Sequence, residues 1–169
     1  MRHFTHPVYT IIPITAQTCE QVMEVFDSNR EFFMLTEGEP ATLAGCRASA
    51  SAVPPEFDVA NKHFFSFWEG KKCVAVLDFL AGYPGPDSLY LGLLLVHGDL
   101  HGAGVGQSIV NALLAAAKKD DFAQVQLAVI ESNAKAIAFW EKLGFVQTGT
   151  STAAMPGGMV NVITMALEI

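Results

Sequence analysis

The stretch Leu89–Gly106, LYLGLLLVHGDLHGAGVG, decides the fold of this chain. Its apolar first half predicts a buried strand, and a helix is predicted from Val105 onward. Between them, Gly102, Gly104 and Gly106 alternate in a short loop. Glycines lack a Cβ atom, so the backbone can turn tightly and approach a ligand closely. N–H groups at the helix start then point at one place, with the positive end of the helix dipole behind them, and such an arrangement binds a diphosphate.

The spacing of these glycines excludes two nucleotide-binding motifs. A Walker A loop requires Gly-Lys followed by Ser or Thr, whereas this chain has Gly106-Gln107. A dinucleotide-binding turn beginning at Gly102 and Gly104 would need its third glycine at position 107, and it would follow the first strand. On this segment alone, an ordinary glycine turn that ends a strand and starts a helix remains open.

Hydrophobic periodicity predicts further elements on both sides of this segment. Strands are predicted at 8–14, 63–69, 71–80, 122–130, 145–149 and 159–168, and strand 89–96 is expected to be the most buried. Helices are predicted around Cys19–Phe26 and at 39–52, 105–119 and 134–143. The expected N-cap of the first helix is Thr15 or Thr18, and Thr18 would form a capping box with Gln21. The expected N-cap of the last helix is Ser132 or Asn133, and Gly144 is expected to end that helix. The order β-α-α-β-β-β-α-β-α-β-β predicts a mixed α/β sheet in a single domain over residues 1–169.

Composition and charge exclude several classes of protein. Hydrophobic residues make up 51% of the 169 residues and charged residues 16%, which excludes a disordered chain. Ten Lys and Arg against seventeen Asp and Glu give a net charge of −7 without a basic stripe, which excludes nucleic acid as a partner. The longest apolar run is far shorter than the ~18–20 residues of a membrane span, and the first residues lack the pattern of a signal peptide.

The cysteines and histidines indicate neither disulfides nor a metal. Cys19, Cys46 and Cys73 are odd in number and widely spaced, which predicts buried free thiols and a cytoplasmic location. The five histidines show no paired metal-ligand spacing, so no metal is expected.

Two segments carry a resemblance to a known family. His101, Gly104 and Gly106 occupy the pattern Gln/Arg-x-x-Gly-x-Gly/Ala after a buried strand, and the stretch from Asn133 to Phe145, NAKAIAFWEKLGF, follows downstream. Together they resemble the GNAT superfamily of N-acetyltransferases. The resemblance implies a single-domain α/β fold with a mixed, mostly antiparallel β-sheet flanked by helices and splayed between the fourth and fifth strands. It also implies acetyl-CoA as cosubstrate.

The resemblance implies a set of residues that bind acetyl-CoA. Main-chain groups of Leu94, Leu95 and Val96 are expected to contact the pantetheine. The loop is expected to contact the pyrophosphate through His101, Gly102, Ala103, Gly104, Val105 and Gly106. Asn133 is expected to contact the pantetheine or cysteamine arm. Asn133 also suits a helix cap. His101 replaces the usual Gln or Arg, so a permanent cation beside the pyrophosphate is lost.

The acceptor implied by the resemblance is a primary amine of a small molecule or peptide, which attacks the thioester directly. Such an amine is protonated in water and must first lose a proton, commonly to a carboxylate. Asp78 is the one acid in the apolar run 74–80, where period-2 alternation places it on one face with Val74 and Val76. Asp78 and Glu131, which ends strand 122–130, are the candidate catalytic residues, and a structural role for Asp78 stays open.

Trp140 stands where many members of the family have a tyrosine that protonates the leaving thiolate. An indole N–H donates a hydrogen bond but does not deliver a proton by ionising. A catalytically silent acyl-CoA-binding sensor is therefore the alternative to an active transferase. The identity of the amine is not encoded in a motif, since its pocket is expected from loops 35–62 and 82–87, and the sequence permits a homodimer.

Overall fold

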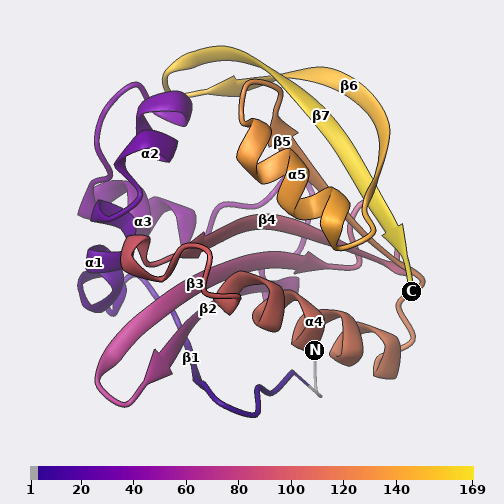
Figure 1. The fold of residues 1–169 in the computed structure, drawn as a ribbon. Helices are drawn as coiled ribbons and strands as arrows, with labels where there is room; N and C mark the ends of the chain where they lie inside the picture. Colours follow the sequence, from indigo (N-terminus) through magenta and orange to yellow (C-terminus); the bar gives the residue numbers. More distant parts are fainter. Residues whose placement is uncertain (1–3) are drawn as a thin grey trace.

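The computed structural model describes residues 4–169, which form a seven-stranded sheet flanked by helices (Figure 1). The strand order across the sheet is β1-β2-β3-β4-β5-β7-β6, and β4 and β5 form its one parallel pair among these residues. This confirms the mixed, mostly antiparallel sheet. The strands are β1 (Thr10–Pro13), β2 (Lys62–Glu69), β3 (Lys72–Ala81), β4 (Ser88–Val96), β5 (Gln124–Ile130), β6 (Val146–Met155) and β7 (Gly158–Glu168).

Helices cover the two faces of the sheet separately (Figure 1). On one face are α1 (Met23–Asp27), α2 (Arg30–Thr36), α3 (Leu43–Ser49) and the short 3₁₀ helix η1 (Cys19–Val22); α4 (Val105–Lys119) and α5 (Ala134–Lys142) lie on the other. Two further 3₁₀ turns are η2 (Val59–Asn61) and η3 (Gly98–Leu100). Each face has its own cluster of buried side chains, with Phe33, Val76 and Leu95 in the first and Leu77, Ile109 and Trp140 in the second.

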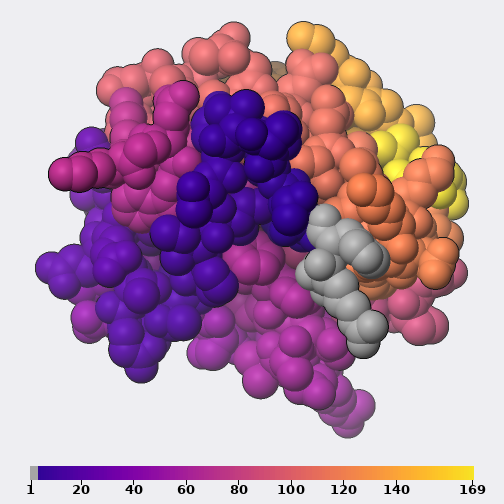
Figure 2. Space-filling model, turned by 90° about the horizontal axis from the view of Figure 1, so that it is seen from below, coloured from indigo at the N-terminus to yellow at the C-terminus, as the bar shows by residue number. Residues whose placement is uncertain are grey.

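Residues 4–9, before β1, lie on the surface against α4 and β2. The His6 ring hydrogen-bonds Ser108 at 3.0 Å, and the Phe4 ring packs on Phe65 and Phe67. Figure 2, seen from below, shows this indigo segment along the exterior of the molecule. These contacts tie the N-terminal stretch to the second buried cluster.

Several predicted elements are confirmed. Helix α4 has the predicted bounds because its apolar residues keep helical spacing, and Ile109 and Leu113 are fully buried. The side chain of Asn133 caps α5 by accepting from the Ala136 N–H at 3.1 Å. Gly144, with φ +92°, follows that helix in the left-handed conformation. All three cysteines are free and buried.

The N-terminal helices were predicted in part. The helix expected at Cys19–Phe26 is present as η1 followed by α1, whereas α2 has no predicted counterpart. The predicted helix 39–52 is shortened to α3, which begins after Thr42 because that side chain accepts from the Gly45 N–H. The expected capping box is absent, since the Thr18 hydroxyl accepts from the Thr15 N–H instead.

Two strand predictions need correction as well. Strand β6 extends to Met155, well beyond the predicted Gly149, because it pairs with β7 along its length. Val74 and Val76 were expected on one face of the sheet but lie in different buried clusters, on opposite faces. The reason is a bulge in β3, opposite Phe67 and Trp68, which interrupts the alternation of side chains between the two faces. Asp78 therefore shares its face with Val76 but not with Val74.

Strand β4 is not the most buried strand, contrary to the prediction. Five consecutive residues of β3, from Cys73 to Leu77, are buried, whereas Gly92 is exposed and Leu93, Leu94 and Val96 are only partly buried. The reason is that the second half of β4 has no strand partner on its β5 side. Within residues 4–169, no helix is long and apolar enough to cross a membrane.

Candidate active site

Strands β4 and β5 part in the middle of the sheet. They pair only from Ser88 with Gln124 to Leu91 with Leu127, while β4 continues to Val96 and β5 stays paired with β7 as far as Ile130. The parting begins at a bulge in β4, where Gly92 is the extra residue between the partners of Asp78 and Phe79. This geometry confirms the splay expected between the fourth and fifth strands.

A cleft of ≈ 1050 Å³ lies over this parting. Helix α2 contributes Arg30, Phe32 and Leu35, the end of β4 contributes Leu94 and Val96, and α5 contributes Phe139 and Trp140. The segment from Gly98 to Gln107 lines it as well, apart from Ala103. The volume suits an extended organic ligand rather than a single ion, since ligand pockets span roughly 300–1,000 Å³.

The glycine loop faces open space in this cleft. Gly102 and Gly104 have φ of +79° and +84°, and a Cβ atom at either position would meet no atom within 4 Å. No side chain caps α4, whose N-cap is Gly104, so the N–H groups of its first turn remain available. Gly106 differs, because a Cβ there would lie 3.3 Å from the Phe139 ring and 3.4 Å from Val96. The loop therefore fits a phosphate-bearing ligand at a helix N-terminus.

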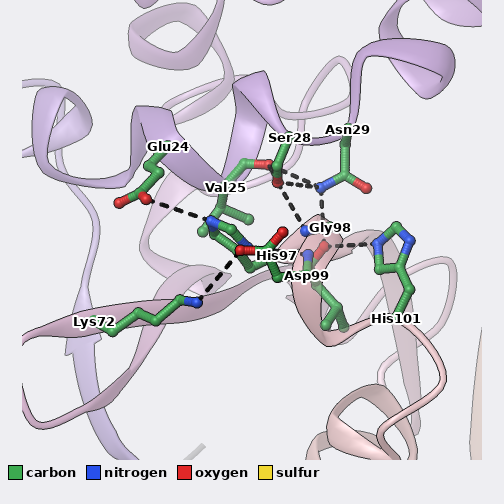
Figure 3. A network of polar contacts seen from close by, with 10 residues as sticks. Glu24, Val25, Ser28, Asn29, Lys72, His97, Gly98, Asp99 and His101 are labelled. Carbon is green, nitrogen blue, oxygen red and sulfur yellow. Dashed lines mark hydrogen bonds and ion pairs between the residues drawn. The ribbon is translucent and has the colours of Figure 1, made fainter.

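Two side chains converge on the carbonyl oxygen of Val96 (Figure 3). Asn29 Nδ2 donates to it at 2.9 Å and also to the Val25 carbonyl at 2.8 Å. His101 Nε2 lies 2.9 Å from the same Val96 oxygen. A carbonyl only accepts, so the His101 ring carries a proton on Nε2. The side chain of His101 is thus bonded to the end of β4 rather than extended over the loop.

His97, between β4 and the glycine loop, is buried (Figure 3). Its Nδ1 accepts from the Asp99 N–H at 3.3 Å, and its Nε2 lies 3.5 Å from Glu24 Oε1. Lys72 Nζ lies 3.8 Å from Asp99 Oδ2. The imidazole therefore caps η3, which leads into the glycine loop, and connects it to α1.

Asp78 is paired and is not the lone buried acid expected from the sequence. Its Oδ2 accepts a hydrogen bond from Lys62 Nζ at 2.5 Å, and the side chains of Lys62 and Asp78 are only 5% and 13% exposed. Burial raises the pKa of Asp78 above its ordinary value, and the Lys62 ammonium opposes that rise. The carboxyl group lies beside the bulge, since a Cβ at Gly92 would be 3.9 Å from Asp78 Cγ. Asp78 does not line the cleft.

Glu131 does not line the cleft either. It is exposed at the end of β5, where its Oε2 accepts from Asn161 Nδ2 at 3.1 Å and its N–H donates to the Asn161 carbonyl. The contacts of Glu131 thus connect β5 to β7.

The remaining candidates divide between cleft and core. Asn133 lines the cleft while its Oδ1 caps α5, so its amide nitrogen is available to a ligand. Leu95 points away from the cleft into the cluster under α1–α3. Trp140 is 7% exposed, packs edge-on against Phe139 and Phe145, and lines the cleft.

Sequence reasoning missed Asn29 and Lys62. Asn29 is 67 residues from its partner Val96, so no local pattern signals the contact. Lys62 had no local signal either, because the turn lies at Gly70-Lys71 and the bulge opposite Phe67 and Trp68 shifts the register that places Lys62 diagonally from Asp78. Among residues 4–169, no three His, Cys, Asp or Glu side chains are grouped as metal ligands.

Comparison with known proteins identifies relatives of this architecture. Residues 22–145 match the Acetyltransferase (GNAT) family. An acetyltransferase from Thermus thermophilus superposes with a TM-score of 0.75 at 23% identity, over 99% of each chain. The ribosomal-protein-S18-alanine N-acetyltransferase from Escherichia coli superposes with a TM-score of 0.68 at 20% sequence identity, over 95% of this chain and 94% of that chain. The ribosomal-protein-S5-alanine acetyltransferase from Vibrio fischeri superposes with a TM-score of 0.72 at 16% sequence identity, over 98% of this chain and 95% of that chain.

Proposed function

Because the chain belongs to the GNAT acetyltransferase family, we propose that it transfers an acetyl group from acetyl-CoA to a primary amine of a small molecule or peptide. The observation that carries this proposal is the cleft at the parting of β4 and β5, with the open glycine loop at one end. A long ligand with a diphosphate fits such a cleft, because the loop N–H groups meet the phosphates and the exposed end of β4 meets the arm.

Most of the residues proposed to hold acetyl-CoA line the cleft. Gly102, Gly104 and the first-turn N–H groups of α4 bind the pyrophosphate, and the main chain of Leu94 to Val96 together with Asn133 binds the pantetheine arm. The Val96 carbonyl already accepts from Asn29 and His101, so Val96 contributes its N–H. Acetyl-CoA supplies a thioester carbonyl that an amine can attack.

Asp78 is proposed as the group that takes the proton of the acceptor. An unperturbed alkyl amine has a pKa near ~10.4 and is protonated at neutral pH, so it is no nucleophile until a base removes a proton. The carboxyl of Asp78 lies beside Gly92, where β4 leaves β5. Glu131 is the second candidate, at the end of β5, and its hydrogen bond to Asn161 commits one of its oxygens to the sheet.

Trp140 favours a second candidate, a catalytically silent acyl-CoA-binding sensor. The indole is packed between two phenylalanine rings beside the cleft and is no proton donor by ionisation. A sensor needs the donor cleft but neither an acceptor site nor a base. The two candidates therefore predict the same binding of acetyl-CoA and differ in transfer.

The test combines binding with transfer. The melting temperature is measured with and without acetyl-CoA, and mass spectrometry then follows acetylation of phenethylamine, spermidine and an alanine-initiated hexapeptide. The peptide is included because two relatives are named for acetylating an alanine of ribosomal proteins. Acetylated product supports the transferase, and a thermal shift without product supports the sensor. No thermal shift contradicts both, since a ligand that binds only the folded state must stabilise it.

The proposal includes three further expectations. The acetyltransferase occupies one domain over residues 1–169, it works in the cytoplasm, and it forms a homodimer. Size-exclusion chromatography with light scattering tests the last of these, because a mass near the 18.2 kDa of one chain contradicts the dimer.

A further inference from the structure

Lys62 is a buried lysine close to the point where β4 leaves β5. Its side chain is 5% exposed, and its Nζ donates to Asp78 Oδ2. Lysine is rarely this buried without a partner, because an ammonium group loses its hydration there. Neither the glycine loop nor the donor cleft involves Lys62, so the role proposed for acetyl-CoA binding leaves this pair unexplained.

The second oxygen of Asp78 is accessible. Oδ1 makes no hydrogen bond with any residue in 4–169, yet no side-chain oxygen or nitrogen there is both buried and without a hydrogen-bond partner. Oδ1 must therefore retain exposed surface, in agreement with the 13% exposure of the side chain. One carboxyl group thus has one oxygen bonded to a buried cation and the other open.

The surroundings of this carboxyl group supply little other charge. Strand β4 presents Gly92 and Leu93 to it, and the titratable group of that strand is Tyr90. On β2, Phe64 is the direct cross-strand partner of Asp78, while the His63 ring packs on Phe65 and Phe79 on the opposite face. Helices α1–α3, which cover this face, place no charged side chain in hydrogen-bond or ion-pair contact with Asp78 among the described residues. Lys62 is therefore the cation that offsets burial of the carboxylate.

We propose that Lys62 is a positioning residue for acetyl transfer, which keeps Asp78 ionised beside the Gly92 bulge so that Oδ1 binds the ammonium of the acceptor and takes its proton. The inference rests on the proposed transferase function. Without the cation, burial favours the neutral form of the carboxyl group, and a neutral carboxyl neither attracts an ammonium nor accepts its proton.

The protons and bonds balance as follows. The ammonium nitrogen of the acceptor gives one proton to Asp78 Oδ1 and keeps the electron pair with which it attacks the thioester carbon. A C–N bond forms and the C–S bond breaks, so the sulfur leaves with its bonding pair. The nitrogen then loses its second proton, one of the two protons ends on the sulfur, and the other passes to solvent. Lys62 takes no part in these proton transfers.

The test is the pH dependence of kcat/KM with acetyl-CoA and the panel amine (phenethylamine, spermidine or the alanine-initiated hexapeptide) that is acetylated fastest. In the wild type, the acidic limb reports ionisation of Asp78. Lys62→Met should move that limb to higher pH by about 1 unit or more, since an opposite charge at this range lowers a carboxyl pKa by roughly 1–3 units. Lys62→Arg, which keeps the cation, should leave the limb within about half a unit of the wild type.

Controls separate this inference from stability and from the proposed function. Lys71→Met removes an exposed lysine of the β2–β3 turn and should leave the profile unchanged. If Lys62→Met does not fold, Lys62→Gln, which keeps a donor but no charge, takes its place with the same expected shift. A profile that only scales down without moving overturns the positioning role. If the wild type acetylates none of the three amines, both the proposed function and this inference are overturned. If the wild type is active and Lys62→Met leaves the acidic limb where it is, this inference alone is overturned.

Discussion

The backbones of Gly98 and Ser28 are in contact: a Cβ atom on Gly98 would stand 2.9 Å from the Ser28 carbonyl oxygen. The Gly98 N–H also donates to the Ser28 hydroxyl at 3.0 Å. The corner between α1 and α2 is thus fixed against η3, which leads into the glycine loop. Since α2 forms one wall of the cleft, this contact sets the spacing between that wall and the loop.

Gly98→Ala should therefore destabilise the fold by about 1–3 kcal/mol, because the added methyl group forces two backbones apart. Urea denaturation measures the loss. Gly85→Ala is the matched control, since a Cβ there lies no closer than 3.4 Å to a neighbouring atom, the side-chain oxygen of Asp87. Equal stability of the two variants would show that the Ser28 contact yields without cost.

Gly104→Val should abolish the thermal shift caused by acetyl-CoA. A Cβ atom at this position meets no atom of the protein within 4 Å, so the valine side chain starts in the open space where the diphosphate is proposed to bind. The left-handed φ of +84° also costs stability, on the order of 1–2 kcal/mol. Gly70→Val controls for this strain, because Gly70 has φ +59°, open surroundings and a position in the β2–β3 turn. An unchanged acetyl-CoA shift in folded Gly104→Val contradicts the assignment of the loop.

Asp78→Asn should lower turnover of the accepted amine by roughly 10²–10⁴, the usual contribution of a positioned base. The acetyl-CoA thermal shift should stay unchanged, because Asp78 lies outside the lining of the donor cleft. Steady-state kinetics and the thermal shift are measured on the same preparation. A smaller loss of turnover, or an equal loss of acetyl-CoA binding and turnover, would mean that Asp78 has a structural role and is not the base.

His63→Phe should make the protein less sensitive to acid. Burial lowers the pKa of His63 from 6.5 to about 4, so between these values the unfolded chain binds a proton that the folded chain does not. Stability is therefore complete above the unfolded pKa and falls as the pH drops from 6.5 toward about 4. Phenylalanine keeps the ring contacts with Phe65 and Phe79 and has no such proton. Denaturant unfolding at a series of pH values should show a smaller loss in this window, and parallel curves for both proteins contradict the prediction.

The sequence predicts those parts of the fold that a local pattern specifies. Helix α4 keeps its apolar residues at helical spacing, so its bounds were predicted correctly, whereas α2 carries the consecutive residues Phe32 to Leu35, which have no period. The glycine loop was recognisable because its spacing is short. Contacts between distant segments were not, as in the bond from Asn29 to Val96 or the ion pair of Asp78, since they depend on register and packing.

Trp140 should not act as a proton donor in the reaction. A thiol is acidic for a leaving group, with a reference pKa of ~8.5 for cysteine, so the C–S bond can break with solvent assistance and late protonation. Trp140→Phe removes the N–H but keeps a ring between Phe139 and Phe145, and it should retain the rate within about tenfold, or roughly 1.4 kcal/mol. Because Trp140 is 7% exposed in a packed cluster, the smaller ring should lower the stability, so rates are compared below both melting temperatures. Trp140→Tyr should not raise the rate by more than the same factor. A large gain with tyrosine at neutral pH would mean that proton donation limits the native protein, and would favour the sensor.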